Sequence, residues 1–196
     1  MNIDPKKATA VVQGFGNVGS HTNRLLVEQG ITIKGISDHT GSFYNESGIN
    51  VKEALEYAKG NGGTLKGFKG GKEVSTEEFL TSNVDILIPA AIQNVITEEN
   101  AHNIKAKLIV EGANGPTTAE ADAILQEKKI IVVPDILANG GGVTVSYFEW
   151  LKNLSHMRFG RMEKRFDSKT YSNFVGLIEK MTAKQIGDRE REFLTR

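Results

Sequence analysis

Three glycines fall within six residues near the start of the chain. The run consists of Gly14, Phe15, Gly16, Asn17, Val18 and Gly19. An apolar run, Ala8–Gln13, precedes this turn, and a helical pattern follows it to about Gln29. In such a strand–turn–helix, the first glycine permits a tight turn, the second lets backbone approach a pyrophosphate, and the third allows close packing of helix on strand. The helix N-terminus favours the phosphates, so we expect all six residues to bind a dinucleotide.

An acid stands at the end of the next apolar run, Ile31–Ser37. Asp38 follows Gly19 by 19 residues, the spacing of the acid that accepts ribose hydroxyls in dinucleotide-binding folds. A carboxylate in contact with a 2′-phosphate repels it by roughly 1–4 kcal/mol. Asp38 therefore favours NAD. No Arg immediately follows it, but His39, Thr40 and Ser42 leave room for NADP, so both coenzymes stay open.

Three later loops also leave the ends of buried strands. They are Pro89–Ala91, Glu111–Thr118 and Pro134–Gly142. In an open parallel sheet the ligand lies at the carboxyl edge, so we expect Ala90 and Ala91 to contact the coenzyme. Asn114 and Asn139 offer donors and acceptors that suit a carboxamide such as that of nicotinamide. The alternative for each Asn is a loop cap or a left-handed turn beside glycine.

The elements that must position these loops alternate between β-branched runs and helical patterns over about 150 residues. Strands are expected at Ala8–Gln13, Ile31–Ser37, Val84–Ile88, Leu108–Val110 and Ile130–Val133. Helices are expected after Gly19, over Val51–Ala58, from Thr76, over Thr97–His102, over Thr117–Glu127 and from about Ala138 through Leu151, with Thr64–Val74 as a loop or small ribbon. This alternation predicts an α/β fold: a Rossmann-type, doubly wound, mainly parallel sheet with helices on both faces.

The alternation stops after Leu154. Phe174, Leu177, Ile178 and Met181 then fall at i, i+3, i+4 and i+7, which predicts an amphipathic helix whose apolar stripe needs a partner. The partner is either another subunit or the chain's own domain. We therefore expect a dinucleotide-binding domain over residues 1–154 and a helical extension over residues 155–196.

The composition argues against several functional classes. A formal net charge of zero argues against a dedicated nucleic-acid binder, because neutralising phosphates needs a basic surplus. No apolar run approaches 20 residues, so no membrane span is expected. The absence of cysteine excludes disulfides, thiol catalysis and zinc–thiolate sites. The four histidines show no i, i+4 pair, so no metal site is expected.

Three of these motifs together resemble the coenzyme domain of glutamate dehydrogenase, in the Glu/Leu/Phe/Val dehydrogenase superfamily. They are the glycine turn, the run Glu111–Thr118 and the run Asn139–Trp150, and the resemblance covers about Thr9 to Leu154. The stretch after Leu154 is more loosely similar to the antenna, a helical protrusion of animal-type hexameric members. The resemblance implies reversible, NAD(P)-dependent oxidative deamination of L-glutamate to 2-oxoglutarate and ammonia, and a homo-oligomer formed through the tail.

The resemblance also implies roles for single residues. Asn114 would contact nicotinamide or its ribose, and Asn139 would lie at the junction of coenzyme and substrate. Val143 and Ser146 would face the distal carboxylate of the substrate, with helix packing as the alternative for both. The position of Gly140 is usually Ala or Ser in the family, so this chain has more backbone freedom beside the expected nicotinamide site.

Family members carry the catalytic lysines and aspartate on a preceding substrate domain, which this sequence does not include. We therefore expect no catalytic residue here, and a chain that binds NAD, with NADP left open, but transfers no hydride by itself. Its expected partners are that substrate domain and, in the whole enzyme, glutamate or 2-oxoglutarate. A cytoplasmic location is expected, or the mitochondrial matrix if a targeting segment precedes the chain.

Two other functions remain open. A non-catalytic NAD-sensing module would need the glycine turn and Asp38 but not the loops of Asn114 and Asn139. The coenzyme domain of a leucine or phenylalanine dehydrogenase would share the turn, but the run Val143–Trp150 and the tail argue against it.

Overall fold

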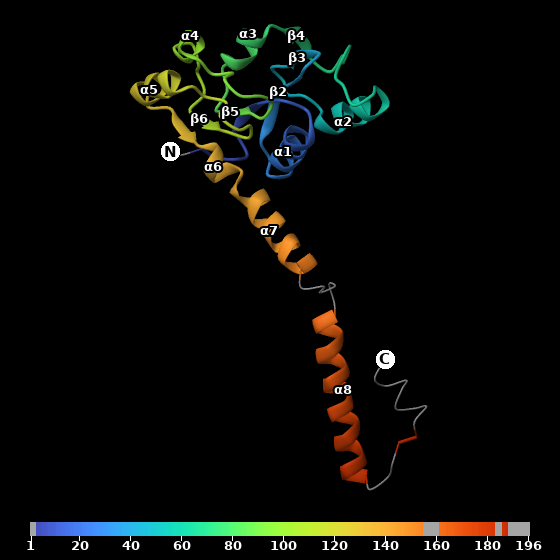
Figure 1. Ribbon diagram of the computed structural model, residues 1–196. Coiled ribbons are helices and arrows are strands. Elements are labelled where there is room, and N and C mark those ends of the chain that lie inside the picture. Colours follow the sequence, from blue (N-terminus) through green and yellow to red (C-terminus); the bar gives the residue numbers. More distant parts are fainter. Residues whose placement is uncertain (1–2, 155–160, 183–185, 188–196) are drawn as a thin grey trace. The chain divides into compact units, whose positions relative to one another are not determined.

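The computed structural model describes residues 3–154, 161–182 and 186–187 (Figure 1). The expected helical extension therefore lies partly outside the described residues, as does His156. The chain forms two compact units, Met1–Gly142 and Val143–Arg196, and each is described by itself. The division falls inside helix α7 (Gly140–Leu154), whereas the domain boundary expected from the sequence lies at the end of this helix.

A seven-stranded sheet forms the centre of the first unit. Its strands are β1 (Thr9–Gln13), β2 (Thr32–Asp38), β3 (Gly41–Tyr44), β4 (Lys72–Val74), β5 (Ile86–Pro89), β6 (Leu108–Val110) and β7 (Ile131–Val133). Their order is β4-β3-β2-β1-β5-β6-β7; β3 pairs antiparallel with both β2 and β4, and the other neighbouring strands pair parallel. The chain builds outward from β1 in both directions. The predicted doubly wound, mainly parallel fold is therefore confirmed, with its switch point between β1 and β5.

Helices cover both faces of this sheet (Figure 1). One face carries α1 (Asn17–Glu28) and α2 (Val51–Gly60), and the other carries α3 (Thr76–Leu80), α4 (Glu98–Ala101) and α5 (Ala119–Glu127). The short α6 (Asp135–Ala138) follows β7. The second unit contains most of α7 and the long helix α8 (Arg161–Thr182).

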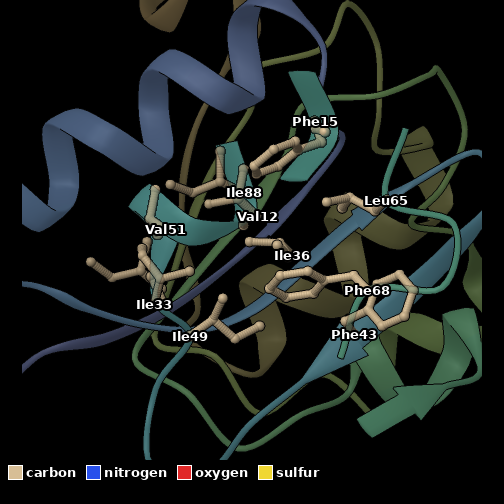
Figure 2. Packing of buried hydrophobic residues seen from close by; sticks show 14 of the residues in the cluster. Val12, Phe15, Ile33, Ile36, Phe43, Ile49, Val51, Leu65, Phe68 and Ile88 are labelled. Atoms are coloured by element: carbon tan, nitrogen blue, oxygen red, sulfur yellow. The ribbon is translucent and has the colours of Figure 1, made fainter. Parts of the chain in front are cut away.

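The apolar sequence of β1 follows from burial on both sides. Val11 and Val12 are both fully buried, but they belong to different hydrophobic clusters, because successive strand residues point to opposite faces. Figure 2 shows the cluster on the α1–α2 side, in which Phe43 and Phe68 meet edge to face at a centroid distance of 5.8 Å. Phe79, Leu125 and Ile109 belong to the other cluster. The buried strand predicted around these residues is confirmed.

Three local predictions differ from the structure. The sequence left Gly41–Tyr44 unassigned, but β3 pairs with β2 through a hairpin that turns directly after Asp38. A single long helix was expected from Ala138, whereas α6 ends there and α7 begins at Gly140. The pattern after the glycine turn predicts that Val18 and Leu25 lie on the apolar face of the helix, but on α1 each is 50% exposed. The buried residues of α1 are instead Gly19 and Asn23, and at Gly19 the helix lies too close to Gly14 for any side chain.

The predicted tail helix is confirmed over Arg161–Thr182, where the structure describes it as α8. Its expected apolar stripe is exposed: Phe174 at 61%, Leu177 at 53% and Met181 at 78%. Among the side chains that the structure describes on this helix, Val175 is buried. The partner of the stripe therefore stays a prediction. Within the described residues, no helix has both the length and the apolar character that crossing a membrane requires.

Candidate functional site

The glycine turn after β1 has two glycines that the fold requires and one that it does not. Gly14 has a φ of +100°, and a Cβ there would lie 2.6 Å from the carbonyl oxygen of Ala90. A Cβ on Gly19 would lie 1.9 Å from the carbonyl oxygen of Gly14, so α1 packs directly on the turn. Gly16 has a φ of −77° and no atom within 4 Å of a Cβ placed on it. Its open side leaves room for a ligand to approach the backbone.

The N-terminus of α1 has no side-chain cap. Gly16 is its capping residue, and no side chain accepts a hydrogen bond from the first turn. Helices α2, α3 and α5 differ, because Asn50, Ser75 and Thr118 each accept such a bond. The unpaired N–H groups and dipole at a helix start bind phosphate well. The exposed backbone at Gly16 therefore fits a pyrophosphate without any charged side chain.

A cavity of about 580 Å³, here called the Asp38 cavity, opens beside this turn. Its wall is formed by the carboxyl ends of β1 and β2, the loop after β5 and the first residues of α3 and α4. Three residues expected to bind coenzyme line it: Gly14, Asp38 and Ala91. The structure thus brings together the turn, the acid and the loop, as expected for parallel strands that end at one edge.

Asp38 is already hydrogen bonded within the fold. Its Oδ1 accepts from the backbone N–H of Thr40 at 2.7 Å and from the Thr40 hydroxyl at 2.5 Å, and its Oδ2 accepts from the N–H of Leu65 at 2.6 Å. Burial raises the pKa of Asp38, but the hydrogen bonds from Thr40 and Leu65 outweigh it and hold the pKa below its usual value. A carboxylate has about four acceptor positions, so Asp38 keeps about one for a ligand.

Gln13 is a polar residue of the Asp38 cavity that the sequence reasoning missed. It is the last residue of β1 and only 8% exposed, and its Oε1 is buried with no hydrogen-bond partner among the described residues. A buried acceptor left unpaired costs about 1–3 kcal/mol, which a ligand donor would recover. The available signal was a single polar residue at the end of an otherwise apolar strand.

A second cavity of about 790 Å³, here called the Asn114 cavity, lies at the ends of β5 and β6. Four residues with an expected coenzyme role line it: Val18, Ala90, Ala91 and Asn114. Ala91 and Ile92 line both cavities. The two cavities are therefore neighbours along the carboxyl edge of the sheet.

The loops that carry the two predicted asparagines are tied together. The Asn139 amide donates to Oδ1 of Asn114 at 3.2 Å. Beneath them, Oε2 of Glu111 accepts from the N–H of Asp135 at 2.9 Å, and Oδ2 of Asp135 accepts from the N–H of Gly115 at 2.8 Å. Glu111 is only 7% exposed, so a buried carboxylate holds both loops in place. Glu111 belongs to a motif singled out in the sequence, but no local pattern predicts this role for it.

Other expected site residues are not among those that line the two cavities. The side chain of Phe15 is buried in the hydrophobic cluster beneath α1 and α2 (Figure 2), which leaves its backbone for any ligand contact. Val143 and Ser146 are exposed on α7 in the second unit. Within the described residues, no group of three His, Cys, Asp or Glu side chains could hold a metal ion.

Comparison with known proteins places this site in a family. Residues 1–192 match the family model described as Glutamate/Leucine/Phenylalanine/Valine dehydrogenase. The chain is 54% identical over 145 residues to an NADP-specific glutamate dehydrogenase of Saccharolobus shibatae, covering 74% of this chain and 34% of that protein. It is 51% identical over 159 residues to an NAD-specific glutamate dehydrogenase of Clostridioides difficile, covering 79% and 38%.

A solved structure shows the same fold. It is described as the hetero-hexameric glutamate dehydrogenase from Thermus thermophilus in a leucine-bound form, with a TM-score of 0.73 and 29% identity, over 83% of this chain and 38% of that one. The chain thus spans little more than a third of the length of these proteins. The family model matches nearly the whole chain, and the chain belongs to the glutamate/leucine/phenylalanine/valine dehydrogenase family.

Proposed function

We propose that this chain is the coenzyme-binding domain of a glutamate dehydrogenase. The observation that carries the proposal is the uncapped start of α1 at Gly16, in a turn where Gly14 lines the Asp38 cavity and Val18 lines the Asn114 cavity. A dinucleotide has one pyrophosphate between two nucleosides, and this turn offers one phosphate position with residues of both cavities close to it in the chain.

Each part of the site has a binding task in this proposal. Backbone N–H groups from Gly16 to Gly19 hold the pyrophosphate, and the remaining acceptor position of Asp38 takes a ribose hydroxyl. Asn114 and Asn139, already paired with each other at 3.2 Å, orient a carboxamide at the other end. A bound nicotinamide coenzyme supplies the hydride acceptor. The chain holds the coenzyme in position, and this orientation of the reacting groups lowers the barrier to hydride transfer.

The activity of the whole protein is part of the same proposal. The proposed activity is the reversible oxidative deamination of L-glutamate to 2-oxoglutarate and ammonia, and it is supported by the relatives, which are named glutamate dehydrogenases. Val143 and Ser146 would face the distal carboxylate of the substrate, while the proton-transfer residues come from the family's substrate domain. A homo-oligomer is proposed as well, because α8 carries an exposed apolar stripe.

Chemical-shift mapping of the isotope-labelled chain with NADH tests the site. The expected result is that the amides of Gly14–Gly19, Ala90–Ala91 and Asn114 shift with one saturation curve. Shifts confined to other parts of the chain would refute the assignment.

The alternatives differ in what the complete protein turns over. The two asparagines, which are hydrogen bonded to each other, favour a dehydrogenase over an NAD-sensing module, which has no need of them. A screen of glutamate, leucine and phenylalanine with the full-length protein separates the substrates. Turnover of glutamate supports the proposal. Preference for leucine or phenylalanine, or turnover of none, selects the corresponding alternative.

A further inference from the structure

Three carboxylates line the Asp38 cavity. Besides Asp38, they are Glu77 in the first turn of α3 and Glu99 in the first turn of α4. Neither Lys nor Arg occurs among the described residues on its wall, where His39 is the other titratable side chain. The sequence points to Asp38 alone. Glu77 and Glu99 lie about 40 and 60 positions further along the chain, and only the fold brings them to the same cavity as Asp38.

A separate observation favours a ligand in this cavity. Gln13 is 92% buried, lines the cavity and has an Oε1 with no hydrogen-bond partner among the residues that the structure describes. Leu80, Ile92 and Val95 form an apolar part of the same wall. A flat heterocycle with donor groups matches this combination of apolar contacts and an unpaired acceptor, and the carboxylates match hydroxyl groups.

A phosphate group, in contrast, is poorly matched to this wall. A sphere of 580 Å³ is about 10 Å across, so every lining charge acts on the contents within about one Debye length. The hydrogen bonds from Thr40 and Leu65 keep Asp38 ionised. Because no cation on the described wall offsets the three negative charges, a dianionic group would be repelled by each of them.

We propose that Glu77 and Glu99 act with Asp38 to select NAD against NADP, by repelling the 2′-phosphate from the adenosine half of the site. This inference rests on the proposed coenzyme-binding function and names two residues that determine its specificity. Overall similarity does not decide the coenzyme, because the chain is 54% identical to an NADP-specific relative and 51% identical to an NAD-specific one.

The chain provides a matched control for this proposal. Glu78 and Glu98 are neighbours of Glu77 and Glu99 on the same helices, carry the same charge, and are absent from the cavity wall. The double variants Glu77→Gln/Glu99→Gln and Glu78→Gln/Glu98→Gln therefore remove equal charge from the same first turns. Calorimetric titration of the wild-type chain and of both variants with NAD and with NADP gives the dissociation constants.

The wild-type chain is expected to bind NAD more tightly than NADP. Glu77→Gln/Glu99→Gln tightens NADP binding by about tenfold, the product of roughly threefold for each charge several ångströms away in a wet cavity. Its affinity for NAD changes by less than about twofold, and Glu78→Gln/Glu98→Gln moves NADP binding by less than about twofold.

Two outcomes would overturn the inference while leaving the proposed function intact. One is equal affinity of the wild-type chain for NAD and NADP. The other is an equal effect of the two double variants on NADP, which would assign the repulsion to general surface charge. If neither coenzyme binds the wild-type chain, the proposed function itself fails, and the two failures are thus distinguishable.

Discussion

The three glycines of the turn are needed for different physical reasons. Gly19 is needed because a side chain would overlap the carbonyl of Gly14 at 1.9 Å, and Gly14 because of its φ of +100°. Gly16 meets neither condition. The sequence motif predicted all three glycines with one rule, but only the structure separates the two that fold the turn from the one left free for a ligand.

This separation gives a stability prediction. Gly19→Ala should lower the free energy of unfolding by about 2–3 kcal/mol, because the new methyl group forces α1 away from the turn. Gly16→Ala should change it by less than about 0.5 kcal/mol, since the added Cβ meets no atom within 4 Å. Urea denaturation of both variants measures the difference. Equal destabilisation would contradict the proposed packing of α1 on the turn.

The hydrogen bonds of Asp38 within the fold could be predicted only in part from the sequence. Its position after Gly19 predicted a ligand role, but its bond to the N–H of Leu65 joins residues 27 apart, and no local pattern reveals that. An Asp38→Ala variant would leave this N–H without its acceptor, so a loss of coenzyme binding would mix folding with recognition. Gln13 and Glu111 were missed for the same reason: their significance depends on burial among distant partners.

At the scale of elements, a carboxylate joins the parallel strands. Asp85, just before β5, accepts from the N–H and hydroxyl of Thr9 at 3.0 and 3.1 Å and from Nζ of Lys107 at 2.7 Å. The bond from Lys107 is the main cause that lowers the pKa of Asp85, and the bonds from Thr9 add to it against the opposing effect of burial.

This site gives a pH-dependent prediction. Because the folded-state pKa of Asp85 lies below its unfolded value, its stabilisation is complete above the unfolded pKa of about 3.9 and is lost as the pH falls through the folded one. Asp85→Asn should therefore cost about 1–2 kcal/mol near pH 7. The variant should also lose less stability than the wild type between pH 5 and pH 3. Parallel pH profiles for the two proteins would contradict this account.

The end of α4 depends on one lysine from another helix. Nζ of Lys128, at the end of α5, donates to the carbonyls of Ala101, His102 and Ile104 at 3.3, 2.5 and 2.7 Å. A cation at these carbonyls stabilises a helix C-terminus. We expect Lys128→Met to lower the free energy of unfolding by about 1–2 kcal/mol, whereas Lys105→Met, at an exposed neighbouring position, should have little effect. Thermal denaturation of both variants checks this, and equal melting temperatures would contradict it.

Most elements were predictable because hydrophobic periodicity and capping residues are local signals. Helix α3 begins at Thr76 as expected, and the hydroxyl of Ser75 caps it by accepting from the N–H of Glu78 at 3.1 Å. Strand β3 was missed because Gly41 and Ser42 lack strand propensity, and pairing with β2 decides their conformation. The exposure of Val18 and Leu25 on α1 was missed because the helix packs through Gly19 against Gly14, and the apolar pattern of the sequence does not show this contact.

At the scale of the whole molecule, the order of the strands brings the residues of the site together. Turn, acid and loops come from positions spread over more than a hundred residues. They meet because β1, β2, β5 and β6 run parallel and end at one edge. This convergence was predictable from the alternation of strands and helices. The sequence did not reveal that the edge holds two cavities, nor that one of them has an acidic wall.

The most direct test of the account is calorimetric titration of the chain with NADH, compared with its Gly16→Val variant. One saturable site is expected in the wild type. In the variant the affinity should fall by at least about tenfold, the loss expected when one charge-assisted hydrogen bond to phosphate is blocked, while the unfolding midpoint stays unchanged. Equal affinity for NADH in the two folded proteins, or no binding to the wild type, would contradict the central claim that the open backbone at Gly16 holds the coenzyme.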